Sequence, residues 1–349
     1  MNVLLKKRII MYSLFLVLML VISSFFIKEK AISVEVETKV ETDINSLAIS
    51  KDENGSIGFE ENDFFKKYTI NCTKDITDLE FNEEKDNLKI KLDKSQVLNI
   101  NIKKGSKVNP SESNFNDDKN LYIINFKKLI MDENYVHVDF QNKKKILVFI
   151  KKKETPYKYK VVVDPGHGGV DAGAYVGKLL EKDLNLKIAK YMLDNLRYNG
   201  CNVVLTRDKD KELDKLVKTD LIKRSAIAND KKADLFVSIH INSNTVSVYN
   251  GVSTYYYDPS GFQKTERLKF AQTMQNEMLK SDDWKDMGEH RQELAVLKRS
   301  NMPSVLVECG FITNASDRDK LSKEATLVNF GLNISNGVLK YLAEGNISK

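Results

Sequence analysis

The chain has 349 residues, 42% of them hydrophobic and 30% charged, so it has room for two domains and can bury a sizeable core. That composition excludes wholesale disorder, and its five prolines exclude a proline-rich rod. The net charge is +6, of which residues 1–30 carry +4. The rest is nearly neutral and lacks the clustered basic footprint of a nucleic-acid-binding protein.

An uncharged apolar run covers residues 9–27, with basic residues on both sides. Its 19 residues match the length that crosses a bilayer core. The positive charges in front predict a cytoplasmic N-terminus over 1–8, a single-pass transmembrane anchor over 9–27 and an extracytoplasmic remainder at the cell membrane. The alternative is a signal peptide, cleaved to leave a secreted protein. Bulky Phe25, Phe26 and Ile27 at the end of the run argue against a cleavage site.

Two segments with different residue patterns follow the apolar run. Residues 28–66 have mixed charge and no sustained period, which predicts a linker or stalk. Over residues 67–153, short segments alternate apolar with polar side chains, as in DNLKIKLD, LYIINFKKL and KILVFIKKK. Alternation at period two predicts a small antiparallel β-rich domain with one solvated face.

Strand-like and helical runs alternate over residues 158–345. Strands are expected at 158–164, 202–208, 235–241, 252–258 and 304–311, and helices at 181–200, 213–229, 262–280 and 324–343. This order predicts an α/β domain whose sheet has helices on both faces. The polar segment 281–294 is expected to form a loop on the active-site side.

The first of these strands runs into a glycine-rich turn, DPGHGG, at residues 164–169. The turn fails the dinucleotide pattern because its sixth position, counted from Gly166, is Asp171, and the chain has no G-K-[ST] phosphate loop. No nucleotide is therefore expected. The turn instead places His167 at a strand's carboxyl end, where His240 and Glu308 also fall on their own strands. Ligands of open α/β sheets bind at this edge.

His167, His240 and Glu181, which begins the first helix, form a donor set that suits one catalytic zinc ion with a fourth position for water. Glu308 would then remain as the general base. From the residues alone, the alternative stays open that each histidine makes only a local backbone contact.

Six separated motifs carry a family resemblance: DPGHGG (164–169), EKDLNL (181–186), LTRD (205–208), R-x-x-I-A-N (224–229), SIHIN (238–242) and PSVLVECGFITN (303–314). In this order they resemble the type 3 zinc-dependent N-acetylmuramoyl-L-alanine amidases of bacterial cell-wall turnover, over roughly residues 158–345. The resemblance implies hydrolysis of the amide between N-acetylmuramic acid and L-alanine in peptidoglycan (EC 3.5.1.28). It also implies that His167, Glu181 and His240 bind zinc and that Glu308 is catalytic.

Four other residues are candidates for supporting or substrate-binding roles. Asp171 is a candidate for holding the His167 loop in place. Asn242 is a candidate either for orienting His240 or for contacting the substrate. Arg207 and Arg224 match family positions, and either structural salt bridges or substrate contacts would explain them.

Some features depart from the family or leave alternatives open. The stretch 287–290 lacks the R-G-x-K pattern frequent in related amidases, which leaves substrate contacts there open, and its His290 is expected to be exposed to solvent. The β-rich segment weakly resembles wall-targeting domains by its position. The alternative functions are a zinc peptidase acting on a peptidoglycan stem peptide and a non-catalytic wall-binding module.

Overall fold

A computed structural model describes residues 57–96, 113–118, 121–129, 133–139, 142–152 and 156–345. None of the helices within these ranges combines the length and apolarity needed to cross a membrane. The expected cytoplasmic end at 1–8 and the expected anchor at 9–27 lie outside the described residues.

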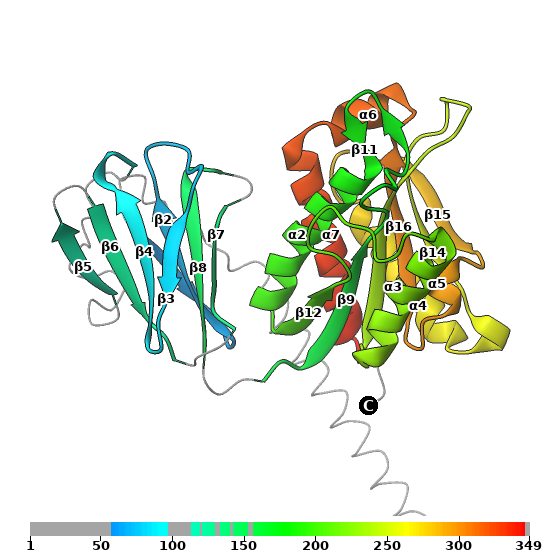
Figure 1. Ribbon diagram of the computed structural model, residues 1–349. Helices are drawn as coiled ribbons and strands as arrows, with labels where there is room; N and C mark the ends of the chain where they lie inside the picture. Colours follow the sequence, from blue (N-terminus) through cyan, green and yellow to red (C-terminus); the bar gives the residue numbers. More distant parts are fainter. Residues whose placement is uncertain are drawn as a thin grey trace, which may run out of the picture. The chain divides into compact units, whose positions relative to one another are not determined.

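The β-rich part contains two four-stranded antiparallel sheets (Figure 1). One has the order β1-β2-β8-β7, formed by Ile57–Glu61, Phe65–Asn71, Lys145–Lys151 and Tyr135–Val138. The other has the order β3-β4-β6-β5, formed by Glu80–Glu83, Asn87–Asp93, Leu121–Lys127 and Ser113–Asp118, and the short 3-10 helix η1 covers Lys94–Gln96.

Both sheets contribute alternate residues to one core, in which Ile70 and Val148 pack with Ile90 and Phe126. The period-two alternation thus marks the inward face of each sheet. The strands begin at Ile57, earlier than the expected domain start at residue 67.

A six-stranded mixed sheet forms the centre of the second part. Its order is β12-β9-β13-β16-β14-β15, and the strands span Cys201–Leu205, Tyr159–Pro165, Leu235–Asn242, Ser304–Phe311, Val252–Tyr256 and Asp286–Arg291. Strands β12, β9, β13 and β16 run parallel, whereas β14 is antiparallel to β16. The carboxyl ends of β9, β13 and β16 therefore lie at one edge of the sheet.

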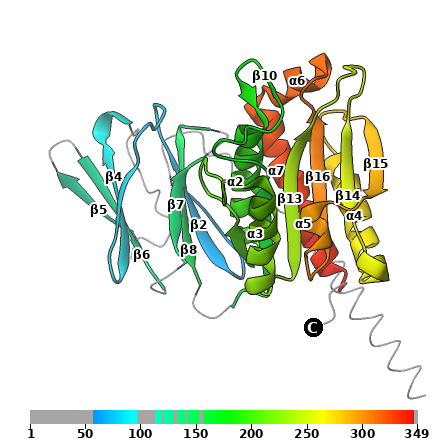
Figure 2. The ribbon, with the colours of Figure 1, turned by 45° about the vertical axis from the view of Figure 1, so that its right-hand side comes forward.

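Helices cover both faces of this sheet, as Figures 1 and 2 show. The helices are α2 Glu181–Tyr198, α3 Val217–Asp230, α4 Lys264–Met278, α5 Ala295–Lys298, α6 Ala315–Leu321 and α7 Glu324–Ala343, with the 3-10 helix η2 at Pro259–Gly261. A two-stranded hairpin, β10 Tyr175–Val176 and β11 Leu179–Leu180, precedes α2.

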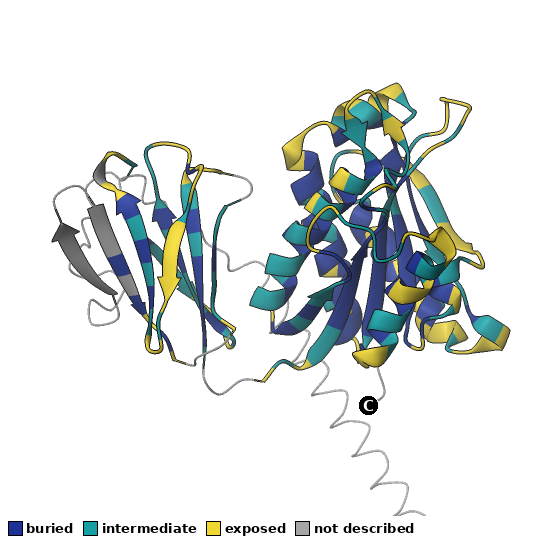
Figure 3. Ribbon diagram, in the orientation of Figure 1, coloured by how far each residue is buried: buried dark blue, intermediate teal, exposed yellow. Residues whose placement is uncertain are grey.

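Alternate strand residues decide which helices each face carries. Val161 and Val163 pack in the core that contains side chains of α2, α4 and α7, whereas Val162 packs in the core with α3 and α5. In Figure 3 the central strands are accordingly almost entirely buried. The expected α/β domain with helices on both faces is confirmed, and the sheet is mixed.

The expectation of a loop over 281–294 is wrong for its middle part, because residues 286–291 form the edge strand β15. Its sequence DMGEHR is largely polar and mostly exposed, and an edge strand with little apolar surface shows no alternation. Its pairing with β14 places His290 opposite Tyr255, which in turn pairs with Leu306. His290 is exposed, as expected, and this register places it roughly 7 Å along the strands from the level of Glu308.

Candidate metal centre

The loop after β9 carries His167 in a left-handed backbone conformation, with φ of +62°. Such a conformation is uncommon for a residue with a side chain. The residue before it must be small, because a Cβ on Gly166 would lie 2.3 Å from Cε1 and Nε2 of His240. Gly166 therefore serves a close approach between the loop and β13, whereas Gly168 and Gly169 have positive φ and approach Lys211 and Glu212. These contacts explain the motif without any nucleotide.

Glu181 is the first residue of α2, directly after the β10–β11 hairpin, and its side chain is 6% exposed. Its Oε2 accepts a hydrogen bond from the Ala174 N–H at 2.7 Å, and Oε1 accepts one from the Ile241 N–H at 3.1 Å. These donors fix the carboxylate against the end of β13. The N-terminus of a helix also favours a negative charge.

The two histidines converge on this carboxylate. Nε2 of His167 lies 3.1 Å from Oε1 of Glu181, and Nδ1 of His240 lies 2.9 Å from the same oxygen. One ligand atom from each of the three residues falls within 4.8 Å of the others. The convergence of the predicted ligands His167, Glu181 and His240 makes this a candidate metal site.

The electrostatics of the three side chains are coupled. Burial would raise the pKa of Glu181, but hydrogen bonds from His167 and His240 hold it well below its usual range. Burial would lower the pKa of His167, and its hydrogen bonds to Glu181 and Asp171 raise it instead. The Glu181 carboxylate is thus ionised, as a divalent cation requires, and each imidazole must be neutral when it binds the cation.

Glu308 lies beside this group because β13 and β16 pair in parallel with His240 opposite Glu308. The residue is partly exposed, but its Oε2 is enclosed and has no hydrogen-bond partner among the described residues. Burial, together with the charge of Glu181, raises the pKa of Glu308 well above its ordinary value. A carboxyl group suited to taking up a proton therefore stands next to the three candidate ligands.

The four other candidate residues have different surroundings. Asp171 lies 2.8 Å from Nδ1 of His167, on the ring nitrogen that faces away from Glu181. Arg207 and Arg224 are both buried and donate to backbone carbonyl oxygens of the His167 loop. Asn242 accepts a hydrogen bond from the Ser243 N–H, and within the described residues no hydrogen bond joins it to His240.

Asp164 is a buried residue whose role sequence reasoning missed, although it opens the DPGHGG motif. It accepts hydrogen bonds from Thr206, Ser238 and Arg224. An acidic residue at the end of an otherwise apolar buried strand was the available indication, since buried charges are usually paired.

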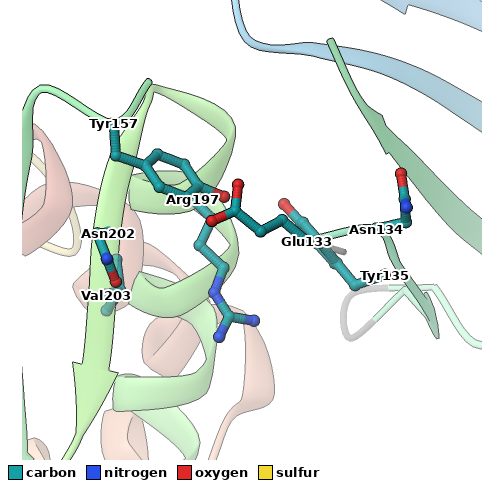
Figure 4. Close-up of a pocket in the computed structure, with 7 residues that line it drawn as sticks. All are labelled: Glu133, Asn134, Tyr135, Tyr157, Arg197, Asn202 and Val203. Atoms are coloured by element: carbon teal, nitrogen blue, oxygen red, sulfur yellow. The ribbon is translucent and has the colours of Figure 1, made fainter. Parts of the chain in front are cut away.

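A separate pocket includes Glu133, Tyr135, Tyr157 and Arg197 in its lining (Figure 4). Arg197 lies in the last turn of α2, whereas Glu181 begins that helix. At about 1.5 Å per residue, the two are roughly 24 Å apart along the axis. This pocket is therefore not part of the candidate metal centre.

The fold and the three converging side chains together define an α/β domain with a candidate metal site at the carboxyl ends of its central strands. Residues 161–340 match the N-acetylmuramoyl-L-alanine amidase family, and the chain belongs to that family. It is an N-acetylmuramoyl-L-alanine amidase (EC 3.5.1.28), which acts on peptidoglycan outside the cytoplasm.

Several known proteins are similar to the chain. It is 38% identical over 181 residues to the amidase LytC of Bacillus subtilis, and this match covers 52% of this chain and 35% of LytC. It is 30% identical over 193 residues to the germination-specific amidase of the same organism, covering 53% and 80%. The solved structure of amidase AmiC2 of Nostoc punctiforme is 38% identical, with a TM-score of 0.49, and the match covers 54% of this chain and 98% of that one.

Proposed function

We propose that His167, Glu181 and His240 hold one zinc ion, with which the chain hydrolyses the bond between N-acetylmuramic acid and L-alanine, and that Glu308 is its general base. Two imidazole nitrogens and a carboxylate oxygen, all within 4.8 Å, are a donor set typical of catalytic zinc. The observation that carries the role of Glu308 is its enclosed, unpartnered Oε2 beside His240.

When bound, zinc supplies Lewis acidity that lowers the pKa of water to about 7 and polarises the amide carbonyl. Glu308 accepts the proton of the attacking water and returns it to the leaving nitrogen of L-alanine. The raised pKa of Glu308 favours the uptake of this proton, because a carboxylate with a higher pKa is the stronger base. The protonated carboxyl group is then the acid that protonates the nitrogen as the C–N bond breaks.

Asp171 has a supporting role in this proposal. Its carboxylate faces Nδ1 of His167, so that this nitrogen carries the proton and donates it to Asp171. Nε2, which faces Glu181, is then the free ligand nitrogen. Such a carboxylate–histidine pair fixes the tautomer and the orientation of the ring.

The products of peptidoglycan digestion test this function. The purified full chain is incubated with peptidoglycan, with and without a zinc chelator, and the products are identified by mass spectrometry. We expect free stem peptides that begin at L-alanine, and loss of these products on chelation. Peptides cut internally would show a zinc peptidase instead, and intact peptidoglycan that retains the chain would show a wall-binding module.

Two glutamine variants test the general base. Glu308→Gln removes the carboxyl group beside His240, whereas the control Glu289→Gln changes an exposed glutamate on the edge strand β15. We expect the first to lose about 10²–10⁴-fold in rate and to keep zinc, and the second to retain its rate. Equal activity of both variants would contradict the assignment.

For the N-terminus we propose a membrane anchor over residues 9–27 that holds the amidase outside the cytoplasm, with the β-rich segment 67–153 directing it to the wall. The 19 uncharged residues between basic clusters support the anchor. Cell fractionation with N-terminal sequencing should find the uncut chain in the membrane fraction. A soluble protein that begins after residue 27 would show a cleaved signal peptide.

A further inference from the structure

Two buried guanidinium groups surround the backbone of the loop that carries His167. Arg207 is 1% exposed and Arg224 is 3% exposed, so neither side chain is available to a substrate at the surface. Both donate to main-chain oxygens of this loop, and Arg224 also pairs with the carboxylates of Asp164 and Asp220.

Arg224, on α3, reaches the loop from one side. Its Nη1 donates to the carbonyl oxygen of Pro165 at 2.9 Å, and its Nη2 donates to the carbonyl oxygen of His167 at 2.9 Å. The same Nη1 lies 2.9 Å from Oδ1 of Asp164, while Nε donates to Asp220. The planar guanidinium therefore joins the helix to two carbonyls of the loop in one rigid arrangement.

Arg207, which follows β12, supplies a second set of donors. Nε donates to the carbonyl oxygen of Pro165 at 2.9 Å, and Nη2 donates to that of Gly166 at 2.9 Å. Nη2 also donates to the carbonyl oxygen of Lys182 at 2.7 Å, in the first turn of α2 beside Glu181. Three successive loop carbonyls are thus held, and one arginine links the His167 loop to the helix that begins with Glu181.

The buried carboxylate of Asp164 extends this network to the third ligand. It is fully buried and accepts hydrogen bonds from Thr206 at 2.6 Å and from Ser238 at 2.8 Å. Ser238 lies two residues before His240 on β13. One connected set of hydrogen bonds therefore reaches the segments that carry all three ligands.

We propose that Arg224 and Arg207 are positioning residues for the metal centre: they hold His167 in its left-handed conformation and fix its distance from Glu181. The inference rests on the proposed zinc site. A chain without these donors would deprive the Pro165 and His167 carbonyls of their guanidinium partners and leave the Gly166 carbonyl to the Asn185 amide alone, at 3.3 Å. The strained loop could then relax toward an ordinary conformation. The ligands would then have to be reassembled when zinc binds, and zinc affinity would fall.

The test compares lysine variants at three buried arginines in the full chain. Arg224→Lys and Arg207→Lys keep the charge but lose the planar fork of donors. Arg267→Lys is the matched control. Arg267 is fully buried and donates to the carbonyl oxygens of Tyr257, Leu297 and Ser300. These residues lie just after β14 and just before β16, at the end of β16 that is far from Glu308.

Two measurements separate positioning from stability: the zinc dissociation constant, by competition with a chromophoric chelator, and the urea midpoint of the metal-free protein. We expect all three variants to lower the midpoint, and only Arg224→Lys and Arg207→Lys to weaken zinc binding, by about 10–100-fold. Asp220→Asn, which keeps an oxygen beside Arg224 Nε but removes its negative charge, gives a milder variant with the same direction of change if the lysine variants fail to fold.

Wild-type zinc affinity in folded Arg224→Lys and Arg207→Lys would overturn the inference, and so would an equal loss of affinity in Arg267→Lys. If the unmodified chain binds no zinc, the proposed metal centre itself fails. That result is distinguishable because it is seen without any substitution.

Discussion

The carboxylate of Asp171 lies 2.8 Å from Nδ1 of His167, while its other oxygen accepts a hydrogen bond from the Gly173 N–H at 3.1 Å. The carboxylate is thereby fixed on the side of the imidazole ring that faces away from Glu181. A partly exposed acidic side chain therefore holds the imidazole ring of a candidate metal ligand.

Asp171→Ala should weaken zinc binding about 10–100-fold, because the imidazole loses the partner that fixes its tautomer and orientation. Its effect on the urea midpoint should be small, since the side chain is 43% exposed. The control is Asp210→Ala, which removes contacts to Gly169 and Lys182 in the same region but none to His167. Equal losses of zinc affinity in both variants would contradict a specific role for Asp171.

Gly166→Ala should disrupt the site sterically. The new Cβ would lie 2.3 Å from the His240 ring, so the ring or the loop must move, and we expect zinc affinity to fall about 100-fold or more. Gly177→Ala is the comparison, because Gly177 has φ of +61° but no atom within 4 Å of the added Cβ. It should lose only about 1 kcal/mol of folding stability and bind zinc normally. Isothermal titration of both variants with zinc measures the two affinities, and equal zinc affinities would contradict the steric role of Gly166.

Glu308→Gln should stabilise the metal-free protein, and increasingly so at higher pH. Burial raises the pKa of Glu308 above its ordinary value of 4.5, so the folded state binds a proton that the unfolded state releases. The wild-type stability contributed by this proton is complete below about pH 4.5 and is lost as pH rises toward the folded-state pKa.

Urea midpoints in the presence of chelator at pH 5 and pH 8 test this dependence. The difference between Glu308→Gln and wild type should be larger at pH 8. A difference that does not grow with pH would show that the Glu308 carboxyl is solvated.

The three cysteines should be unreactive in the native protein. Burial raises the pKa of Cys72 to about 11 and that of Cys201 to about 12, and it raises the pKa of Cys309 well above its ordinary range. At pH 8 the thiolate fraction is therefore about a thousandth or less, and thiolate is the reactive form. Because the folded pKa values are raised, the stability these thiols contribute is present below about pH 9 and is lost above it.

Labelling with iodoacetamide at pH 8 tests this expectation. The native protein should react at least about 100-fold more slowly than the same protein unfolded in guanidinium. Rapid modification of any one cysteine in the native state would show that its thiol is accessible and that the local packing is looser than described.

The ligand set could be predicted from the sequence because it follows from topology. His240 and Glu308 lie at the carboxyl ends of runs whose apolar residues identify buried parallel strands, and parallel neighbours bring these ends together. Glu181 could be included because it opens the helix that follows the His167 loop.

Other features could not be predicted, for identifiable reasons. The edge strand β15 has too few buried side chains to show a period. Arg207 and Arg224 both donate to main-chain carbonyls of the His167 loop, and no side-chain pattern reveals such contacts. The left-handed conformation of His167 likewise depends on tertiary contacts, since a positive φ is uncommon even for histidine, which adopts it more often than most residues.

Anomalous diffraction at the zinc absorption edge, from crystals of the protein grown with zinc, tests the central claim most directly. We predict one strong peak in the catalytic domain, within bonding distance of Nε2 of His167, the Glu181 carboxylate and Nδ1 of His240. A peak bound to other residues, or a crystal of active amidase with no zinc peak at this centre, would contradict the account.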